Sequence, residues 1–162
     1  MKISQPNLLN YFLICLTLFF TLFLSATSSA AEFDSCLASA SKVEHRLNRI
    51  ESVRICFEKN KKHLDSESCY KGTSTLKTKN YSTEIMDQLK ATCFYDVSRF
   101  KSVSICLQKA KIFELADSHD EAIFECYSQF QDELNQKQCL AVSELLRYPA
   151  KKEYLAEHCL TK

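Results

Sequence analysis

The spacing of the cysteines constrains the fold of this chain more than any other feature of its sequence. Eight of the nine cysteines are separated by intervals of 20, 13, 24, 13, 20, 13 and 20 residues. These eight are Cys36, Cys56, Cys69, Cys93, Cys106, Cys126, Cys139 and Cys159. The intervals define a two-cysteine repeat that occurs four times with a period of 33 residues, and the second copy is four residues longer. A period of this length is typical of stacked supersecondary units.

Repeats one to four, defined by this spacing, cover residues 36–68, 69–105, 106–138 and 139–162. An apolar or aromatic residue follows each of the eight cysteines. In repeat three, Ile123, Cys126, Tyr127 and Phe130 stand at positions i, i+3, i+4 and i+7, which places them on one face of a helix. The pattern therefore predicts two short helices in each repeat. We expect the first helices near 35–46, 66–77, 103–116 and 136–147, and the second helices near 49–61, 83–98, 119–132 and 149–160.

Residues that favour the starts of helices recur in register with the cysteines. Asp65, Ser102 and Asn135 each stand nine residues after a second cysteine, and all three are good N-caps for the first helix that follows. An alternative interpretation fuses a second helix with the next first helix into a long rod, for example over 83–116. The recurring caps favour breaks between the helices.

The second helices carry start signals of their own. Ser82 is an expected N-cap, and Pro149 occupies the N1 position that proline prefers. Asn48 and Ser118 are each followed three residues later by a glutamate, which is the pattern of a capping box. We expect these second helices to begin directly after Asn48 and Ser118.

The sequence thus predicts an all-α fold of four tandem disulfide-stapled helix hairpins, arranged as an αα solenoid or as a compact helical bundle. The chain contains a single glycine, Gly72. It therefore lacks the glycine-rich turns of phosphate loops, dinucleotide-binding motifs and nucleophile elbows. Such scarcity also argues against a β-sandwich or barrel, whose tight turns use glycine repeatedly. We expect one domain, over residues 31–162.

Residues 1–30 have the pattern of a secretory signal peptide. Lys2 is the only charged residue before Glu32, an apolar run covers Tyr11–Leu24, and a stretch of small residues follows it. The apolar run is shorter than the about 20 residues that span a bilayer, which favours a signal peptide over an uncleaved membrane anchor. We predict cleavage after Ala30 or Ala31, and a secreted or periplasmic protein that is not held in a membrane after cleavage.

Without Lys2 the chain has 20 basic and 20 acidic residues, since the whole sequence has 21 and 20. Its net charge is then near zero. This balance offers no electrostatic attraction for nucleic acid or for an anionic membrane. We therefore expect neither of them as a partner.

Exported cysteines in even number are expected to form disulfide bonds. Pairing inside each repeat uses all eight in four equivalent bridges, 36–56, 69–93, 106–126 and 139–159. In a helix hairpin, Cys106 and Cys126 come roughly opposite each other, as a Cα separation of about 6 Å requires. Pairing across the 13-residue intervals instead leaves Cys36 and Cys159 at opposite ends of a stack. The four additional residues of repeat two are expected in its turn, near 77–81.

The sequence carries no recognisable motif for catalysis or metal binding. It contains no C-x-x-C pair, and oxidised cysteines are not ligands or nucleophiles, so we expect no metal site, no redox site and no cofactor. His119 stands beside Asp120 and Glu121, and we interpret this group as the exposed start of a helix rather than an acid–base site. We therefore expect the protein not to be an enzyme.

The repeat architecture favours a protein-binding or structural module whose partner is another protein, because stacked helix pairs present extended surfaces. The alternative is a carrier of a small apolar ligand, held between helices around Phe94, Phe100, Phe113 and Phe130. Packing of these rings in the core is the simpler interpretation. An open surface would support the first hypothesis, and a closed cavity of several hundred Å³ would support the second.

Overall fold

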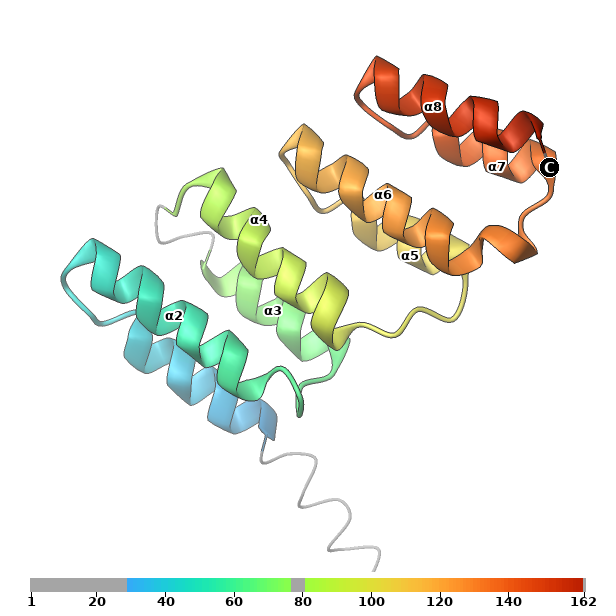
Figure 1. Cartoon of the computed structure of the whole chain (residues 1–162). Helices are drawn as coiled ribbons and strands as arrows, with labels where there is room; N and C mark the ends of the chain where they lie inside the picture. The colour runs from blue at the N-terminus through green and yellow to red at the C-terminus, as the bar shows by residue number, and fades with distance from the viewer. Residues whose placement is uncertain (1–28, 77–80, 162) are drawn as a thin grey trace, which may run out of the picture. The chain divides into compact units, whose positions relative to one another are not determined.

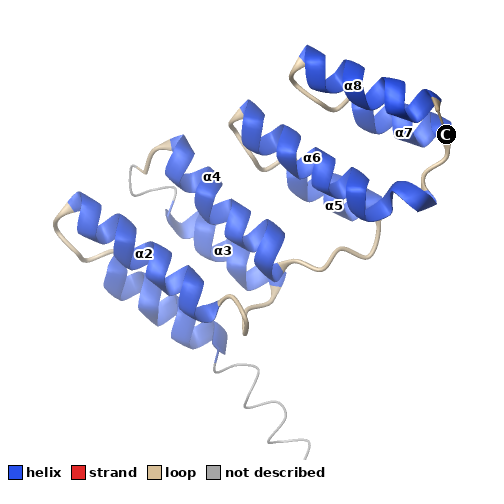
Figure 2. Ribbon diagram, viewed as in Figure 1, coloured by secondary structure: helices blue, strands red, loops and turns tan. Residues whose placement is uncertain are grey.

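A computed structural model of the chain describes residues 29–76 and 81–161. All regular secondary structure in these residues is helical and forms four hairpin-like pairs, so the predicted all-α fold is confirmed (Figures 1 and 2). The helices are α1 (29–40), α2 (Arg46–Asn60), α3 (Ser66–Leu76), α4 (Thr83–Ala91), α5 (Val103–Ala110), α6 (Ala116–Phe130), α7 (Gln136–Ser143) and α8 (Pro149–Leu160). A π-helical turn (Thr92–Val97) follows α4, and a 3-10 turn (Gln131–Glu133) follows α6.

A disulfide bond joins the two helices of every pair, with the pairing that the repeat predicts. The Cα–Cα distance is 5.8 Å for Cys36–Cys56, 5.6 Å for Cys69–Cys93, 5.6 Å for Cys106–Cys126 and 5.5 Å for Cys139–Cys159. The two helices of each hairpin therefore bring the cysteines of a repeat opposite each other. All eight predicted disulfide cysteines are therefore confirmed in their predicted pairs.

The chain divides into two compact units, an N-terminal unit (Met1–Cys56) and a C-terminal unit (Phe57–Lys162). In the N-terminal unit, Phe33 and Leu37 of α1 and Val53 of α2 are buried. The Arg49 guanidinium donates a hydrogen bond to the carbonyl of Val43 in the turn between the helices, at 3.2 Å. The expected single domain over 31–162 stays a prediction.

The C-terminal unit contains a continuous apolar core that runs through three repeats. In this unit α4, α6 and α8 form one row of helices, and α3, α5 and α7 form a second row behind it (Figure 1). The core extends from Phe94 in repeat two, through Phe113 and Ile123 in repeat three, to Leu155 and Cys159 in repeat four. Each of these five side chains is at most 1% exposed. Neighbouring repeats therefore share one hydrophobic core.

The predicted N-caps of α3, α4, α5 and α7 are confirmed. The Asp65 carboxylate accepts the backbone N–H of Ser68 at 2.8 Å. Ser82 and Ser102 cap α4 and α5 through their hydroxyls. Asn135 forms a reciprocal capping box with Gln138, and Pro149 begins α8. The long rod over 83–116 is not formed, because α4 and its π-helical turn end at Val97 and α5 begins only at Val103.

The predicted helix boundaries are wrong at the starts of two helices and at the ends of three. The helices α2 and α6 begin at Arg46 and Ala116, so Asn48 and Ser118 lie inside the first turn instead of capping it. The first helices of repeats one, three and four also end earlier than predicted, at residue 40, Ala110 and Ser143. The chain leaves the helix there because the following turns carry Phe113 and Leu146 into the core, where they are 1% and 5% exposed.

The additional residues of repeat two were expected in its turn, near 77–81, and most of them are found in a helix instead. The helix α3 has 11 residues, whereas α5 and α7 have 8 each. Three of the four additional residues therefore lengthen α3. The predicted location of the additional residues, near 77–81, otherwise falls on residues 77–80, which lie outside the described residues.

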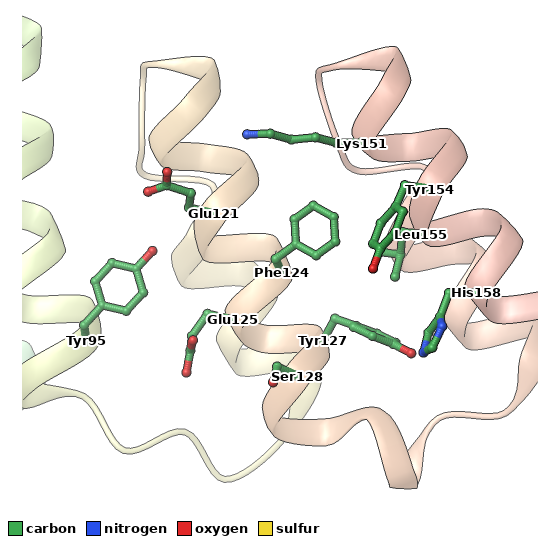
Figure 3. A pocket seen from close by; sticks show the side chains of 10 residues that line it. All are labelled: Tyr95, Glu121, Phe124, Glu125, Tyr127, Ser128, Lys151, Tyr154, Leu155 and His158. Carbon is green, nitrogen blue, oxygen red and sulfur yellow. The ribbon is translucent and has the colours of Figure 1, made fainter.

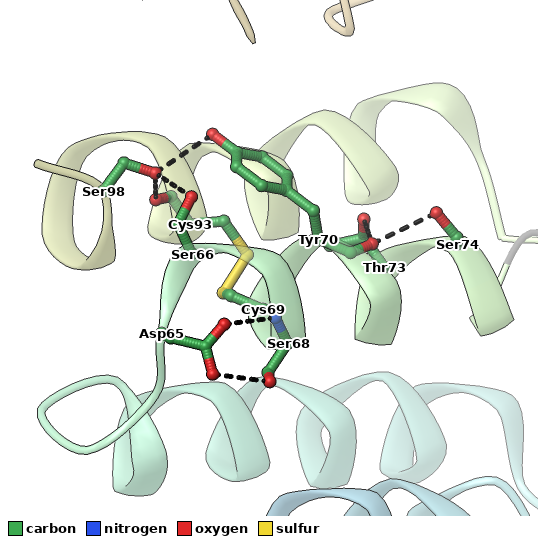
Figure 4. The surroundings of a disulfide bond; sticks show 9 residues. All are labelled: Asp65, Ser66, Ser68, Cys69, Tyr70, Thr73, Ser74, Cys93 and Ser98. Atoms are coloured by element: carbon green, nitrogen blue, oxygen red, sulfur yellow. Dashed lines mark hydrogen bonds between the residues drawn. A yellow bond between two sulfur atoms is a disulfide. The ribbon is translucent and has the colours of Figure 1, made fainter. Parts of the chain in front are cut away.

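The disulfide of repeat two lies beside a network of hydroxyl groups that ties the start of α3 to the end of the π-helical turn that follows α4 (Figure 4). The Ser98 hydroxyl donates to the carbonyl of Cys93 at 2.8 Å and lies 2.8 Å from the Ser66 hydroxyl. The hydroxyl of Tyr70 lies 3.4 Å from that of Ser98. Ser98 is 6% exposed, so these bonds satisfy a buried hydroxyl beside the disulfide of Cys69 and Cys93.

Removal of one staple should destabilise the protein without rearranging the others. We expect the double substitution Cys106→Ala with Cys126→Ala to lower the free energy of unfolding by about 2–5 kcal/mol. The physical reason is that the unfolded chain loses a constraint on a 20-residue segment. Urea unfolding measures the loss, and non-reducing peptide mapping should still find the other three bridges. The substitution Cys106→Ala alone serves as the comparison, because the remaining thiol of Cys126 can exchange with neighbouring disulfides. Non-native pairing of the remaining six cysteines in the double variant would contradict the prediction that each repeat forms its disulfide independently.

Candidate functional site: a groove between α6 and α8

A groove of about 600 Å³ lies on the face formed by α6 and α8 (Figure 3). Ten residues line it: Tyr95, Glu121, Phe124, Glu125, Tyr127, Ser128, Lys151, Tyr154, Leu155 and His158. Four of them, at 121, 124, 125 and 128, form an i, i+3, i+4, i+7 stripe on α6. Another four, at 151, 154, 155 and 158, form the same stripe on α8. The groove is therefore built by one face of each helix.

The walls of the groove are held by ring contacts across it. The ring centroids of Phe124 and Tyr154 are 6.3 Å apart, and those of Tyr127 and His158 are 6.0 Å apart in an edge-to-face arrangement. Leu155 is 1% exposed and closes the floor, whereas Tyr154 is 67% exposed at the rim. The groove therefore combines a buried apolar floor with solvent-accessible aromatic side chains at its rim.

A buried aspartate fixes the position of α8 against α6. The Asp120 carboxylate is completely buried. It accepts the backbone N–H of Arg147 at 2.8 Å and that of Tyr148 at 3.0 Å, directly before α8 begins. Its third contact is the His119 Nδ1 atom, at 3.1 Å. These bonds satisfy N–H groups at the start of α8, so α8 is capped by a side chain of the neighbouring repeat.

The same device occurs one repeat earlier. Asp87 of α4 is 2% exposed and accepts the backbone N–H groups of Glu114 and Leu115, at 3.0 and 2.8 Å, directly before α6. Its charge is paired with the buried Lys90 ammonium at 2.8 Å, and this ammonium also donates to the carbonyl of Ile112 at 2.9 Å. Repeats two, three and four are thus connected in series by buried carboxylates.

The sequence analysis missed these aspartates, although a signal was present. Asp87 and Asp120 are 33 residues apart, and each stands six residues before the second cysteine of its repeat. The corresponding positions of repeats one and four hold Ile50 and Glu153. The interpretation of His119 as exposed was wrong, since its side chain is buried against Asp120 at 6% exposure. The helix starts at Ala116, so His119 faces inward, one turn further along than expected.

The groove has an acidic end. Glu121 and Glu125 stand one turn apart on α6, opposite Tyr95 of the π-helical turn (Figure 3). Burial, and after it the negative charges of these two glutamates, raise the pKa of Tyr95 to about 12. The phenol is therefore neutral at physiological pH. Lys151 extends from α8 toward Glu121 (Figure 3), and its ammonium lies 3.2 Å from the Asp117 carboxylate.

The phenylalanines proposed to surround an apolar ligand pack against one another instead. The ring centroid of Phe94 lies 4.9 Å from that of Phe100 and 5.6 Å from that of Phe113. Phe94, Phe113 and Phe130 are 1%, 1% and 8% exposed and belong to the core, against which Phe100 packs. These four side chains therefore fill the core, as the simpler interpretation of the sequence held.

A second groove, of about 630 Å³, lies between α5 and α7 in the other row of helices. Its lining is aliphatic instead of aromatic and includes Val103 and Leu107 on one side and Val142 and Leu145 on the other. Gln108, Gln138 and Lys111 add polar groups at its edges. In chemical terms this groove suits apolar surface, whereas the groove between α6 and α8 combines rings with carboxylates.

The described part of the chain contains no group of three or more His, Cys, Asp or Glu side chains arranged to hold a metal ion. No helix in the same residues is long and apolar enough to cross a membrane. The fold and the grooves define the protein as a disulfide-rich, all-helical repeat protein. Comparisons of the chain with protein-family models, with curated proteins and with solved structures gave no significant match.

Substitution of the buried aspartate should loosen the repeat that carries one wall of the groove. We expect Asp120→Asn to lower the free energy of unfolding by about 2–4 kcal/mol, because the amide keeps only one acceptor oxygen and its NH2 group then faces a backbone N–H that has lost its acceptor. Urea unfolding measures the change. Asp132→Asn, at an exposed position of the 3-10 turn, is the matched control and should have little effect. An equal decrease in the free energy of unfolding in both variants would show that the buried contacts of Asp120 add no stability beyond that of an exposed carboxylate.

The same carboxylate should make stability depend on pH. Burial alone would raise the pKa of Asp120, but the N–H groups of Arg147 and Tyr148 and the contact with His119 outweigh it and hold the pKa below 3.8. Because the pKa is lower in the folded than in the unfolded state, this stabilisation is complete above the unfolded value and is lost as the pH falls through the folded one. We expect the free energy of unfolding to decrease as the pH falls below about 5, and less steeply in Asp120→Asn. Parallel pH profiles for the two proteins would contradict this assignment.

Proposed function

We propose that the protein is an exported binding module whose protein partner docks in the groove between α6 and α8. The observation that carries the proposal is that α6 and α8 each line the groove with one face, and that these two faces bring aromatic side chains together above a buried floor. Tyr154 and Tyr95 are 67% and 41% exposed, and tyrosine is enriched among the residues that dominate binding at protein interfaces.

The stapled architecture supports this function. The disulfide of each pair and the hydrogen bonds of Asp120 hold the two walls before a partner arrives. A preformed surface loses less conformational entropy on binding, so more of the contact energy appears as affinity. A binding surface that is assembled from short helices depends on such constraints.

The disulfides indicate an oxidising compartment outside the cytoplasm, where such bonds form and persist. The proposed route to that compartment is the signal peptide at 1–30, of which residues 1–28 lie outside the described residues. We therefore propose that the protein is secreted to the periplasm or to the exterior, and that its partner protein is in the same compartment.

Peptide selection tests the proposed docking site. Peptides displayed on phage and selected on the oxidised chain should bind at least about ten-fold more weakly to the double variant Phe124→Ala with Tyr154→Ala, because an interface loses most affinity when its aromatic anchors are truncated. Ile105→Ala is the control, since Ile105 is 45% exposed on α5 and does not line either groove. Affinities are measured by isothermal titration calorimetry. Peptides that bind the double variant as tightly as the wild type would place the docking site elsewhere.

The second candidate function, a carrier of a small apolar molecule, is favoured by the groove between α5 and α7. Its volume of about 630 Å³ and its apolar walls fall in the range of small-molecule sites. If this function is correct, the fluorescent probe anilinonaphthalene sulfonate should bind the folded chain and be displaced by a fatty acid. The substitution Leu107→Gln should weaken both, while Phe124→Ala should not. Absence of probe binding to the folded chain would exclude the carrier function.

A further inference from the structure

The groove between α6 and α8 carries enough chemistry to define the kind of segment that docks there. We propose that its acidic end, formed by Tyr95, Glu121 and Glu125, receives an arginine or lysine side chain, so that the partner presents a basic segment. This inference rests on the proposed docking function and specifies the chemistry of the partner.

The first argument is the charge of the two glutamates. Glu121 and Glu125 stand at i and i+4 of α6, where like charges destabilise a helix by a few tenths of a kcal/mol. Neither carboxylate forms an ion pair with a described residue of the C-terminal unit. The polar contact of Glu125 is a hydrogen bond from the Gln129 amide, at 2.8 Å. Within the described residues, the two glutamates therefore place negative charge at the groove without an ion-paired cation.

The second argument is the aromatic surface beside these charges. Tyr95 lines the groove and is 41% exposed, so its ring offers a face on which a cation can stack. Tyr95 stands opposite Glu121 and Glu125 (Figure 3), and burial together with the negative charges of these glutamates raises its pKa. A guanidinium or ammonium at this position would contact an aromatic ring and two carboxylates together. Each of these interactions favours a cation over a neutral side chain.

The third argument is that the lysine in the groove is already paired. Lys151 also lines the groove, and its side chain extends from α8 toward Glu121 (Figure 3). Its ammonium nevertheless lies 3.2 Å from Asp117 and 5.0 Å from the ring centroid of Tyr148. Its charge is thus balanced by Asp117, outside the groove lining. The middle of the groove, with Phe124 and Leu155, is apolar. The complementary segment has a basic residue at one end and apolar residues after it.

Titration with charge-matched peptides tests the inference. The probes are blocked peptides of four arginines, four lysines or four glutamines, and the readout is the backbone amide spectrum of the ¹⁵N-labelled oxidised chain. We expect the arginine and lysine peptides to shift amides near Tyr95, Glu121 and Glu125, and the glutamine peptide to leave them unchanged. The double variant Glu121→Gln with Glu125→Gln should raise the dissociation constant of the arginine peptide at least about ten-fold.

Two controls separate the local site from general electrostatics. The double variant Glu133→Gln with Glu153→Gln removes the same charge from exposed positions that do not line the groove, and it should leave the dissociation constant within about two-fold. Tyr95→Phe keeps the ring and should retain binding, whereas Tyr95→Leu should weaken it.

The outcomes distinguish the inference from the proposed function. Equal weakening by both glutamate pairs, or equal binding of the glutamine and arginine peptides, would overturn the basic specificity. Phage-selected peptides that dock in the groove without a basic residue would also overturn it and leave the docking function standing. Peptides that fail to contact the groove at all would overturn both.

Discussion

The structure depends on cross-links between helices that are too short to be stable alone. Helices of 8 to 15 residues are marginal in water without tertiary contacts. Each disulfide joins cysteines 20 or 24 residues apart, and closing a loop of that size contributes about 3 kcal/mol by restricting the unfolded chain. The disulfide-linked hairpin is the smallest unit of this fold. The apolar core and the buried carboxylates then connect one hairpin to the next.

Buried carboxylates connect three of these hairpins to one another in series. Asp87 and Asp120 each cap the second helix of the following repeat through two backbone N–H groups. A buried charge is costly unless it is paired and hydrogen-bonded, and here Lys90 and His119 complete the two sites. The contacts are directional, so they set the position of one repeat on the next more narrowly than apolar packing alone would.

The groove between α6 and α8 follows from both constraints. The staples fix which face of each hairpin turns to the core, and Asp120 fixes the start of α8. The residues left on the outer faces, such as Phe124 and Tyr154, then line a preformed groove. The exposed residues of α6 and α8 determine the chemistry of the groove, whereas the disulfides and the buried contacts determine its shape. Substitutions on the outer faces can therefore change the chemistry of the groove without changing the fold.

The sequence by itself determined the repeat, the all-helical class, the four disulfide pairs and the caps at Asp65, Ser102 and Asn135. These features are local or periodic, so spacing and side-chain chemistry reveal them. Only the tertiary structure decided where the first helices end, that His119 is buried and which residues line the grooves. Phe113 leaves its helix because the core of neighbouring repeats can bury it, and Asp120 acts on N–H groups 27 and 28 residues away. Contacts between repeats decide such features, because they depend on how the hairpins pack and not on the pattern within any one of them.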